Sequence, residues 1–416
     1  DIEDSDYRSP LALAVANNDV ACAQLLADAM GDRTEDYVLP LRFAAFLGRV
    51  SDVKRLIEAR ANLEEGDKTA LMLAALRGNT ECAQLLVNAN ANVDARTYSG
   101  ESALNIAAEN GHLDCVQLLL DANADINAQD GKSKTALVAA ADNGHTACVE
   151  LLLNLNADIH IRDRHGNSAF LWAARNGHTT CMQLLMNAKA DIAQRNDDGS
   201  SASLMAAGNG HSACLQVLLD ANADIEAADR CGRTALICSM RYGHTACVQL
   251  LCEAKANINA KSIIDSRTAM MWAEHDDAEC VQLLIDAKAD IHAKDKLYGR
   301  NALMCAARNG HIECVKLLLE AKADIHAKDE AGDTAFMLAA FYGDYACLQL
   351  LIDAKADVDV KERYDGQSAL MRLVESGNIE CVEVLANAKI NVNARDKHGN
   401  TALILAALHF DPEHFL

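Results

Sequence analysis

The sequence has few aromatic residues and few prolines, and its positive charge is low for its length. Aromatic residues make up 4% of the 416 residues, and there are 3 prolines. The core must therefore be built from small and aliphatic side chains, which suits short, closely packed helices. The formal net charge is -22. This argues against nucleic acid as a partner, because sequence-independent binding requires Lys and Arg to neutralise phosphates.

Long apolar segments are also missing from the chain. No apolar run reaches the roughly eighteen residues of a membrane span, and residues 1–30 lack the basic-then-apolar order of a secretory signal. We therefore expect a cytoplasmic protein in a reducing compartment, without direct membrane insertion. The first residues, Asp1-Ile2-Glu3, resemble Asp224-Ile225-Glu226 between two later repeats. We expect from this that the segment belongs to a longer protein.

A small polar residue followed by an Ala-rich run recurs along the chain with a period of 33 residues. Two intervals are 34 residues long, and the first two are 30. This period predicts a single array over residues 1–416 with about thirteen repeats, the last of them incomplete or a capping unit. The anchor residues are Ser9, Leu39, Thr69, Ser102, Thr135, Ser168, Ser201, Thr234, Thr268, Asn301, Thr334, Ser368 and Thr401.

Each repeat carries signals for two short helices. In one unit, Thr135 can cap a helix over residues 136–142, Asn143-Gly144 can end it, and a second helix follows at about 146–154. The linking stretch, for example residues 324–329, is short and leads into an Asp-x-x-Gly turn. We expect this stretch to be extended and to project as a hairpin-like finger.

The repeat resembles the ankyrin repeat. The matching residues in one unit are Asp163, Gly166, Ser168, Ala173-Ala174, Gly177-His178, Leu184-Leu185 and Ala190-Asp191-Ile192. The resemblance covers nearly the whole chain. It implies an all-α fold: an ankyrin-repeat solenoid of helix-turn-helix units with projecting β-hairpin-like fingers.

The departures from the family pattern are consistent. Ala replaces the Pro after the anchor except at Pro10 and Pro40, and residues such as Met304 replace the family's His. Lys or Asn replaces the Gly before Ala-Asp. A Lys there, such as Lys322, is expected to be strained in a left-handed conformation, whereas Asn tolerates it.

The sequence contains 15 cysteines, and eleven of them recur at one site in the second helix. They are Cys22, Cys82, Cys115, Cys148, Cys181, Cys214, Cys247, Cys280, Cys314, Cys347 and Cys381. Packed helices lie about 8–10 Å apart, beyond the roughly 7 Å that a disulfide allows between Cα atoms. Core packing is therefore the better interpretation of this row.

Histidines follow the turn Gly in six repeats, at His112, His145, His178, His211, His244 and His311. The repeat spacing keeps their rings too far apart to share a metal, so we interpret them as residues that fix the turn. No glycine-rich phosphate loop, metalloprotease motif or nucleophile elbow occurs. We therefore expect no catalytic activity, no cofactor and no metal.

One repeat, over residues 263–295, breaks the pattern twice. Its finger carries an extra residue and no Gly, and its inter-helix turn is one residue short. Two interpretations stay open: drift within the stack, or a local kink that reshapes the binding groove. A weaker alternative is a metal site at His275, Asp276 and Asp277.

In the ankyrin family, the finger tips and first helices line a concave binding face. In this sequence, large aromatic residues and arginines gather at those positions from the eighth repeat onward, and they are typical of interface hot spots. The predicted protein-binding residues are Arg230, Arg233, Arg241, Tyr242, Arg267, Trp272, Leu297, Tyr298, Arg300, Arg308, Phe341, Tyr342 and Tyr364. Trp272 and Phe341 have an alternative role as fillers between helices.

The arginines suggest an acidic or extended partner segment, because Arg binds carboxylates through two hydrogen bonds. In the ankyrin family, Asn at one finger position can be hydroxylated, and Asn127, Asn259 and Asn393 match that position. The sequence thus predicts a non-catalytic scaffold or adaptor that binds another protein. The alternative is a regulatory or targeting domain of a larger kinase or ubiquitin ligase, or of a membrane channel.

Overall fold

The structure is a computed structural model that describes residues 21–22, 25, 41–272, 277–376 and 379–409. The chain divides into two compact units, Asp1–Asp197 and Asp198–Leu416. Each unit is described by itself. That the two units form one continuous array stays a prediction.

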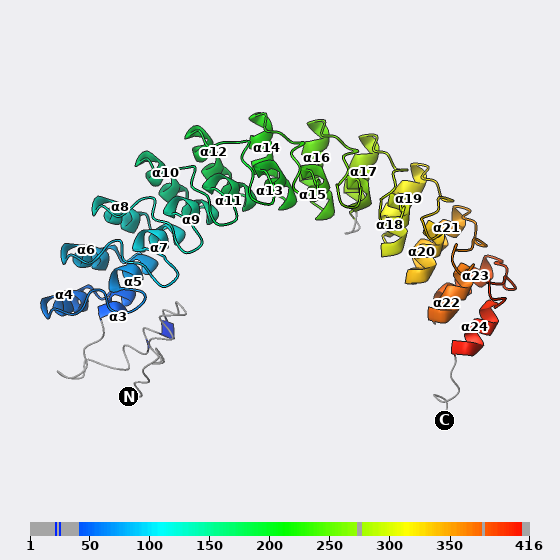
Figure 1. The fold of residues 1–416 in the computed structure, drawn as a ribbon, viewed down its shortest axis with the longest axis horizontal. Helices are drawn as coiled ribbons and strands as arrows, with labels where there is room; N and C mark the ends of the chain where they lie inside the picture. The colour runs from blue at the N-terminus through cyan, green and yellow to red at the C-terminus, as the bar shows by residue number, and fades with distance from the viewer. Residues whose placement is uncertain (1–20, 23–24, 26–40, 273–276, 377–378, 410–416) are drawn as a thin grey trace, which may run out of the picture. The chain divides into compact units, whose positions relative to one another are not determined.

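The described residues of both units fold into pairs of short helices, as predicted, and contain no β-strand (Figure 1). The first helices of the repeats in unit 1 are α3 (Leu41–Leu47), α5 (Ala70–Arg77), α7 (Ala103–Glu109), α9 (Ala136–Asp142) and α11 (Ala169–Arg175). The second helices are α4 (Val50–Glu58), α6 (Thr80–Asn88), α8 (Leu113–Asp121), α10 (Thr146–Asn154) and α12 (Thr179–Asn187).

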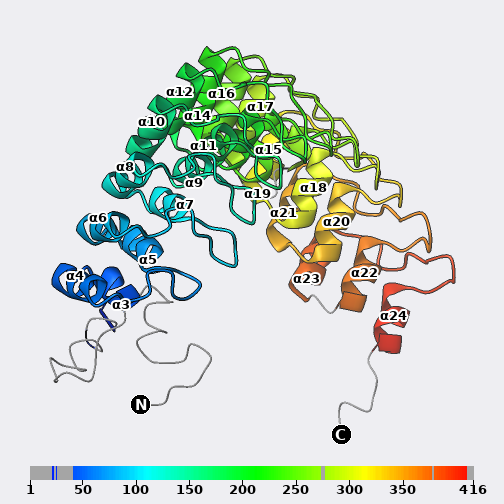
Figure 2. The same ribbon diagram turned by 60° about the vertical axis from the view of Figure 1, so that its left-hand side comes forward.

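Unit 2 repeats the same arrangement. Its first helices are α13 (Ala202–Gly208), α15 (Ala235–Arg241), the 3-10 helix η1 (Ala269–Trp272), α18 (Ala302–Asn309), α20 (Ala335–Tyr342), α22 (Ala369–Ser376) and α24 (Ala402–His409). Its second helices are α14 (Ser212–Asp220), α16 (Thr245–Glu253), α17 (Ala278–Asp286), α19 (Ile312–Glu320), α21 (Tyr345–Asp353) and α23 (Ile379–Asn387). Within each unit, first helices pack on first helices and second helices on second helices (Figure 2).

Many of the anchor residues cap the first helices, as predicted, whereas the Thr268 hydroxyl is buried and makes no hydrogen bond within the described residues. The Thr135 side chain accepts a hydrogen bond from the backbone N–H of Val138 at 3.3 Å, while Thr135 itself is extended. This satisfies one of the amide groups that a helix leaves free at its start. At the other end, Gly144 has φ +74 and turns the chain into the second helix.

The core between the helix layers consists of small and aliphatic side chains. Ala140 and Leu152 are fully buried, and ten of the eleven cysteines of the row are 0–1% exposed. This confirms core packing for those ten, whereas Cys22 is exposed. Small side chains let neighbouring helices approach closely, so each repeat buries its surface against the next. No helix in the described residues is long and apolar enough to cross a membrane.

The histidines after the turn Gly connect consecutive repeats. The His178 Nε2 atom lies 3.0 Å from the backbone oxygen of Asp142, which ends the first helix of the preceding repeat. A Cβ at Gly144 would lie 2.4 Å from the His178 ring, so this Gly is needed for the close approach as well as for its φ. The histidines thus fix the turn of the preceding repeat.

The fingers are turns closed by an Asp. The Asp163 carboxylate accepts backbone hydrogen bonds from His165 at 2.8 Å and Asn167 at 2.9 Å. In some fingers an isolated antiparallel bridge joins the two sides, for example Lys261 with Thr268 and Lys361 with Ser368. The fingers are therefore hairpin-like without regular strands.

The irregular repeat differs from the others in its first helix. The segment after Thr268 forms the 3-10 helix η1, and the second helix α17 begins after Asp277, whose side chain accepts from Cys280 N. His275 and Asp276 lie outside the described residues. The same holds for Ser9, Leu39, Pro10 and Pro40 of the first two repeats, and for the chain end after residue 409.

The residue before each Ala-Asp pair has a left-handed backbone, as predicted. The φ angle is 65 at Lys189, Lys322 and Lys355, and 64 at Asn90. A Cβ in this region meets the neighbouring carbonyl, which costs about 1–2 kcal/mol for residues other than Gly. The lysines therefore carry local strain.

We predict that Lys322→Gly stabilises the protein by up to about 1 kcal/mol, because the strain relieved exceeds the added entropy of the unfolded chain. Thermal and urea unfolding of the whole chain measure the change. The control is Lys316→Gly inside α19, which should destabilise by about 1 kcal/mol. A lower melting temperature for Lys322→Gly would contradict the strain argument.

Candidate protein-binding surface

The predicted binding residues of unit 2 lie in two rows. The tip row is on the fingers and holds Arg230, Arg233, Arg267, Leu297, Tyr298, Arg300 and Tyr364. The helix-end row is at the last turn of the first helices and holds Arg241, Tyr242, Arg308, Phe341 and Tyr342. One first helix of seven or eight residues separates the rows, a length of about 11 Å at 1.5 Å per residue.

The large apolar residues of both rows are exposed, as predicted. Their exposed fractions run from 49% to 67%. The residues are Tyr242, Leu297, Tyr298, Phe341, Tyr342 and Tyr364. Phe341 is therefore not a filler between helices; its ring lies edge-on to Tyr342 with the centroids 5.1 Å apart.

The helix-end row contains arginines stacked on aromatic rings. The Arg241 guanidinium lies 5.6 Å from the Tyr242 centroid, and that of Arg308 lies 4.7 Å from the Tyr342 centroid. The Arg308 Nε atom is buried and has no hydrogen-bond partner in the described part of the chain. Stacking holds these side chains in place, which lowers the entropy that they lose when they bind.

Trp272 is the exception, and the structure corrects its placement. The residue is 9% exposed, and the guanidiniums of Arg241 and Arg267 each lie 4.8 Å from the centroid of its ring. The 3-10 helix ends at this residue, so the ring fills space beside the neighbouring first helices. Trp272 therefore supports the surface from beneath and is not part of the exposed contact area.

Three tip-row arginines form ion pairs within the protein. Arg233 pairs with Asp229 at 2.6 Å, Arg267 with Asp295 at 3.6 Å, and Arg300 with Asp329 at 3.1 Å. These three aspartates are buried. The guanidiniums therefore neutralise carboxylates of the scaffold. Of the predicted arginines, this leaves Arg230, Arg241 and Arg308 for a partner.

Sequence reasoning missed three residues of this surface. Arg372 lies 5.4 Å from the Phe341 centroid and pairs with Asp333 at 2.9 Å. Ile263 and Ile264 are exposed at the tip of the irregular finger. Their signal was the failure of the repeat: no other finger of the array carries two consecutive isoleucines at its tip.

The finger asparagines have a structural role in two of three cases. The Asn127 and Asn259 side-chain oxygens accept the backbone N–H groups of Asp158 and Asp290 in the next repeat, at 2.9 and 2.8 Å. Asn393 is exposed and has no such bond in the described residues. Hydroxylation at these positions stays a prediction, and for Asn127 and Asn259 it must occur beside this inter-repeat bond.

The cysteine and histidine rows are occupied by packing and by inter-repeat bonds. Burial raises the pKa of the Cys82, Cys148 and Cys247 thiols to about 11, so the reactive thiolate is disfavoured. Within the described residues, no group of three His, Cys, Asp or Glu side chains is placed to hold a metal ion.

The two helix layers and the repeated caps, turns and fingers define a solenoid of helical repeats, in which each unit contacts only its neighbours. Two family models match the sequence. The model for ankyrin repeats (3 copies) matches residues 41–130, 129–196, 180–262, 261–329 and 336–414, and that for ankyrin repeats (many copies) matches 310–352. The chain belongs to the ankyrin repeat family, whose members are generally protein–protein interaction modules. A comparison with curated proteins finds no match.

We predict that the buried cysteines of the row resist alkylation in the folded protein. Iodoacetamide at pH 8 should label the exposed Cys22 before Cys148 or Cys247, because their high pKa and burial suppress the thiolate. Peptide mass spectrometry of the labelled chain measures the order. Labelling in guanidinium is the control, and it should modify every cysteine. Native labelling of Cys148 as fast as Cys22 would contradict the packing role.

We predict that Asn259→Ala lowers the stability of the protein by about 0.5–1 kcal/mol, because the inter-repeat hydrogen bond from Asp290 N loses its acceptor. Chemical unfolding of the whole chain measures the loss. Asn393→Ala is the matched control at the same repeat position and should be nearly neutral. Equal effects of the two substitutions would show that the bond from Asp290 N contributes nothing.

Proposed function

We propose that this protein is a non-catalytic scaffold or adaptor that binds a partner protein through the first-helix and finger surface of unit 2. The observation that carries the proposal is the gathering of exposed aromatic and apolar residues on that surface. Only 4% of the chain is aromatic, yet Tyr242, Tyr298, Phe341, Tyr342 and Tyr364 are all exposed there.

Physical reasons support a binding role for these side chains. A Tyr or Phe ring buries a large area and loses little rotamer entropy, so such residues dominate the free energy of protein association. Exposed apolar side chains that gather on one surface are unfavourable in water unless a partner covers them. The helices beneath are rigidly packed, which keeps the surface preorganised.

The structural roles of the cysteines and histidines support a non-catalytic function. The buried cysteines and the bonded histidines serve the repeat, and their positions follow its period. Free buried thiols also agree with a reducing, cytoplasmic location, because cytosolic proteins keep their thiols reduced. We therefore include in the proposal that the scaffold is non-catalytic and that it works in a reducing, cytoplasmic environment.

We predict that Tyr298→Ala combined with Tyr342→Ala weakens partner binding roughly tenfold or more, since the two rings lie in the two rows of the surface. Quantitative mass spectrometry of proteins retained by immobilised wild-type and variant chains measures the effect.

The matched control is Tyr98→Ala with Tyr345→Ala. Tyr98 belongs to unit 1 and Tyr345 to the second helix α21, and both are exposed. The control variant should retain the same partners as the wild type. A partner set that depends on the control tyrosines and not on Tyr298 and Tyr342 would place the binding surface elsewhere.

A further inference from the structure

The acidic residues that follow the extended stretch of each finger in unit 2 are buried, whereas several Lys and Arg side chains of the same fingers are exposed. The buried acids are Asp229, Asp295, Asp329, Asp333, Glu362 and Asp396. The Asp333 carboxylate accepts from Arg372, and the other carboxylates accept backbone N–H groups of the finger turn: Asp396, for example, accepts from His398 at 2.9 Å and Asn400 at 2.7 Å. The finger edge is therefore locally cationic although the chain carries a net charge of -22.

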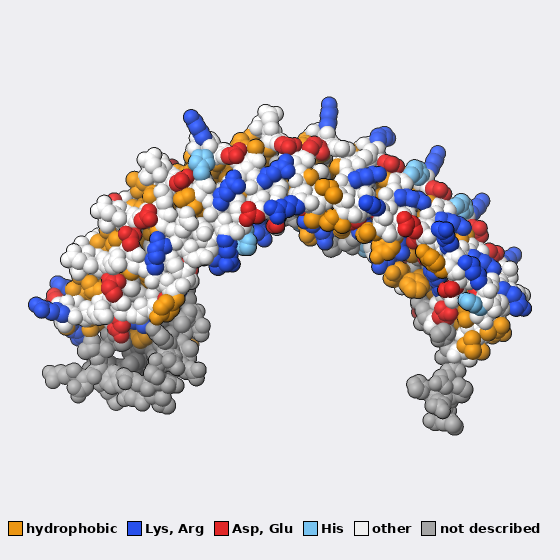
Figure 3. Space-filling model, viewed as in Figure 1, with side chains coloured by type: hydrophobic (Ala, Val, Ile, Leu, Met, Phe, Trp, Pro, Cys, Tyr) orange, Lys and Arg blue, Asp and Glu red, His pale blue; other side chains and the backbone are white. Residues whose placement is uncertain are grey.

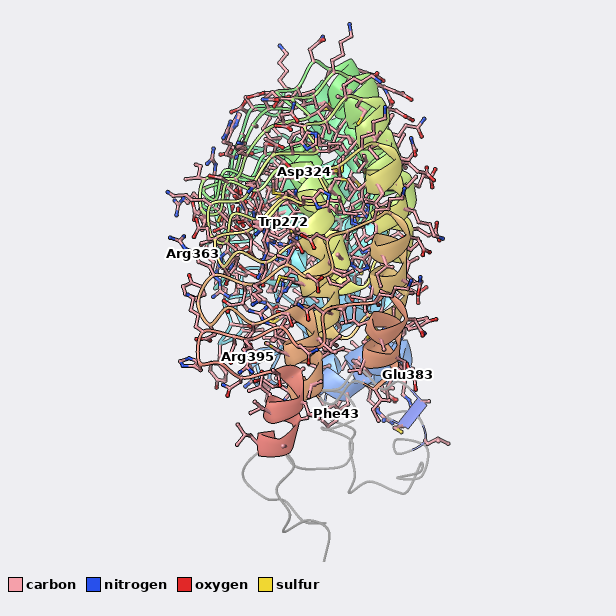
Figure 4. The ribbon with its side chains drawn as sticks, turned by 90° about the vertical axis from the view of Figure 1, so that its right-hand side faces the viewer. Phe43, Trp272, Asp324, Arg363, Glu383 and Arg395 are labelled. Carbon is pink, nitrogen blue, oxygen red and sulfur yellow. The ribbon has the colours of Figure 1, made fainter. Side chains whose placement is uncertain are left out.

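One exposed cation recurs at the same finger position in five successive repeats. We call this set the finger cation row: Lys261, Lys294, Lys328, Lys361 and Arg395. Lys and Arg side chains recur on this face of unit 2 with apolar side chains between them (Figure 3). Arg363 and Arg395 extend on the finger side, and Glu383 lies on the opposite side (Figure 4).

Further cations stand nearer the finger tips. Lys296, Arg363 and Lys397 are exposed at the tips, beside the exposed acids Glu330 and Asp365. Asp365 lies 3.8 Å from the ring of His398. Exposed acids also lie where the fingers begin, at Asp290, Asp324, Asp357 and Asp359, so the exposed cations of these fingers outnumber the exposed acids by eight to six.

Backbone hydrogen bonds between fingers fix the spacing of the row. The N–H of Lys296 donates to the oxygen of Asp265 at 2.7 Å, and that of Arg363 donates to Ala331 at 2.7 Å. A side chain adds a bond in the opposite direction, because the Lys294 Nζ donates to the backbone oxygen of Lys328 in the next finger at 2.6 Å. The cations thus repeat with the helices, which pack about 8–10 Å apart.

The spacing of the cations determines how far apart the negative charges of a matching ligand must lie. In a polyproline II segment, every third residue lies on one face and advances about 9 Å, which matches the row. In a β-strand, residues on one face are about 6.6 Å apart, so the charges would fall out of register. The ligand is a polypeptide because the exposed Leu297, Tyr298 and Tyr364 at the tips offer apolar contacts to its intervening residues.

We propose that the finger cation row binds an extended acidic polypeptide segment in the polyproline II conformation, with a carboxylate at every third residue. This proposal rests on the proposed scaffold function and names the chemistry of its partner. In this proposal, the acidic residues of the partner contact the exposed cations of the fingers. They do not contact the three tip-row arginines that form ion pairs within the scaffold.

Fluorescence anisotropy of a labelled peptide with the whole chain tests the proposal. The peptide carries Glu at every third position, with Pro and Ala between. The control peptide has the same composition with its Glu residues contiguous. The spaced peptide should bind more tightly, and added salt should weaken its binding because exposed ion pairs are screened.

The protein variant for this test is Lys261→Glu with Lys328→Glu. Neither side chain makes a hydrogen bond that ties neighbouring fingers together in the described residues, so the fold should be retained, and a thermal melt checks this. Binding of the spaced peptide should fall at least about tenfold, because two attractions become repulsions. Lys316→Glu on α19 is the matched control and should leave the affinity unchanged.

Two outcomes would overturn the proposal. One is equal binding of the spaced and contiguous peptides. The other is binding to phosphatidylserine vesicles that depends on Lys261 and Lys328, without binding of the spaced peptide, since this would assign the row to a membrane surface. Neither outcome affects the scaffold function, which the Tyr298 and Tyr342 variants test separately.

Discussion

The close packing of each repeat against its neighbour is the constraint on which the rest of the structure depends. A pair of helices as short as α9 and α10 buries too little surface to be stable alone, so its core is completed by the adjacent repeats. Small residues such as Ala140 and Cys148 allow this approach. The bond from His178 to the preceding repeat and the contacts between fingers keep the same spacing at the edges.

This constraint separates the residues of the scaffold from those available for function. A side chain that serves the contact between repeats recurs from repeat to repeat, as the buried cysteines and many of the histidines do. A side chain that contacts a single point of a partner has no reason to recur, whereas a partner that itself repeats along the array can contact one position in successive repeats, as proposed for the finger cation row. Tyr298 and Tyr342 are exposed and break the period, whereas Trp272 also breaks it but is buried. Irregularity therefore indicates a candidate site only when exposure accompanies it.

The local structure was predictable from the sequence because its causes are local. The helix over 136–142 and the left-handed backbone at Lys322 follow from caps and turn residues within a few positions. The partners of the arginines were not predictable, because they depend on which carboxylate the next finger brings close. Arg300 pairs with Asp329 of the following repeat. The burial of Trp272 likewise follows from a 3-10 helix that only the structure reveals.

The charge on the finger surface also depends on which residues serve the scaffold and which are available for function. An Asp that closes a turn must be buried to accept the backbone N–H groups, and this removes its charge from the surface. The Lys and Arg side chains of the finger cation row are exposed and keep their charge in water. Net charge therefore describes the chain as a whole but not the finger edge. In a repeat protein, the sign of the charge on a binding surface depends on which charged side chains are buried in the turns.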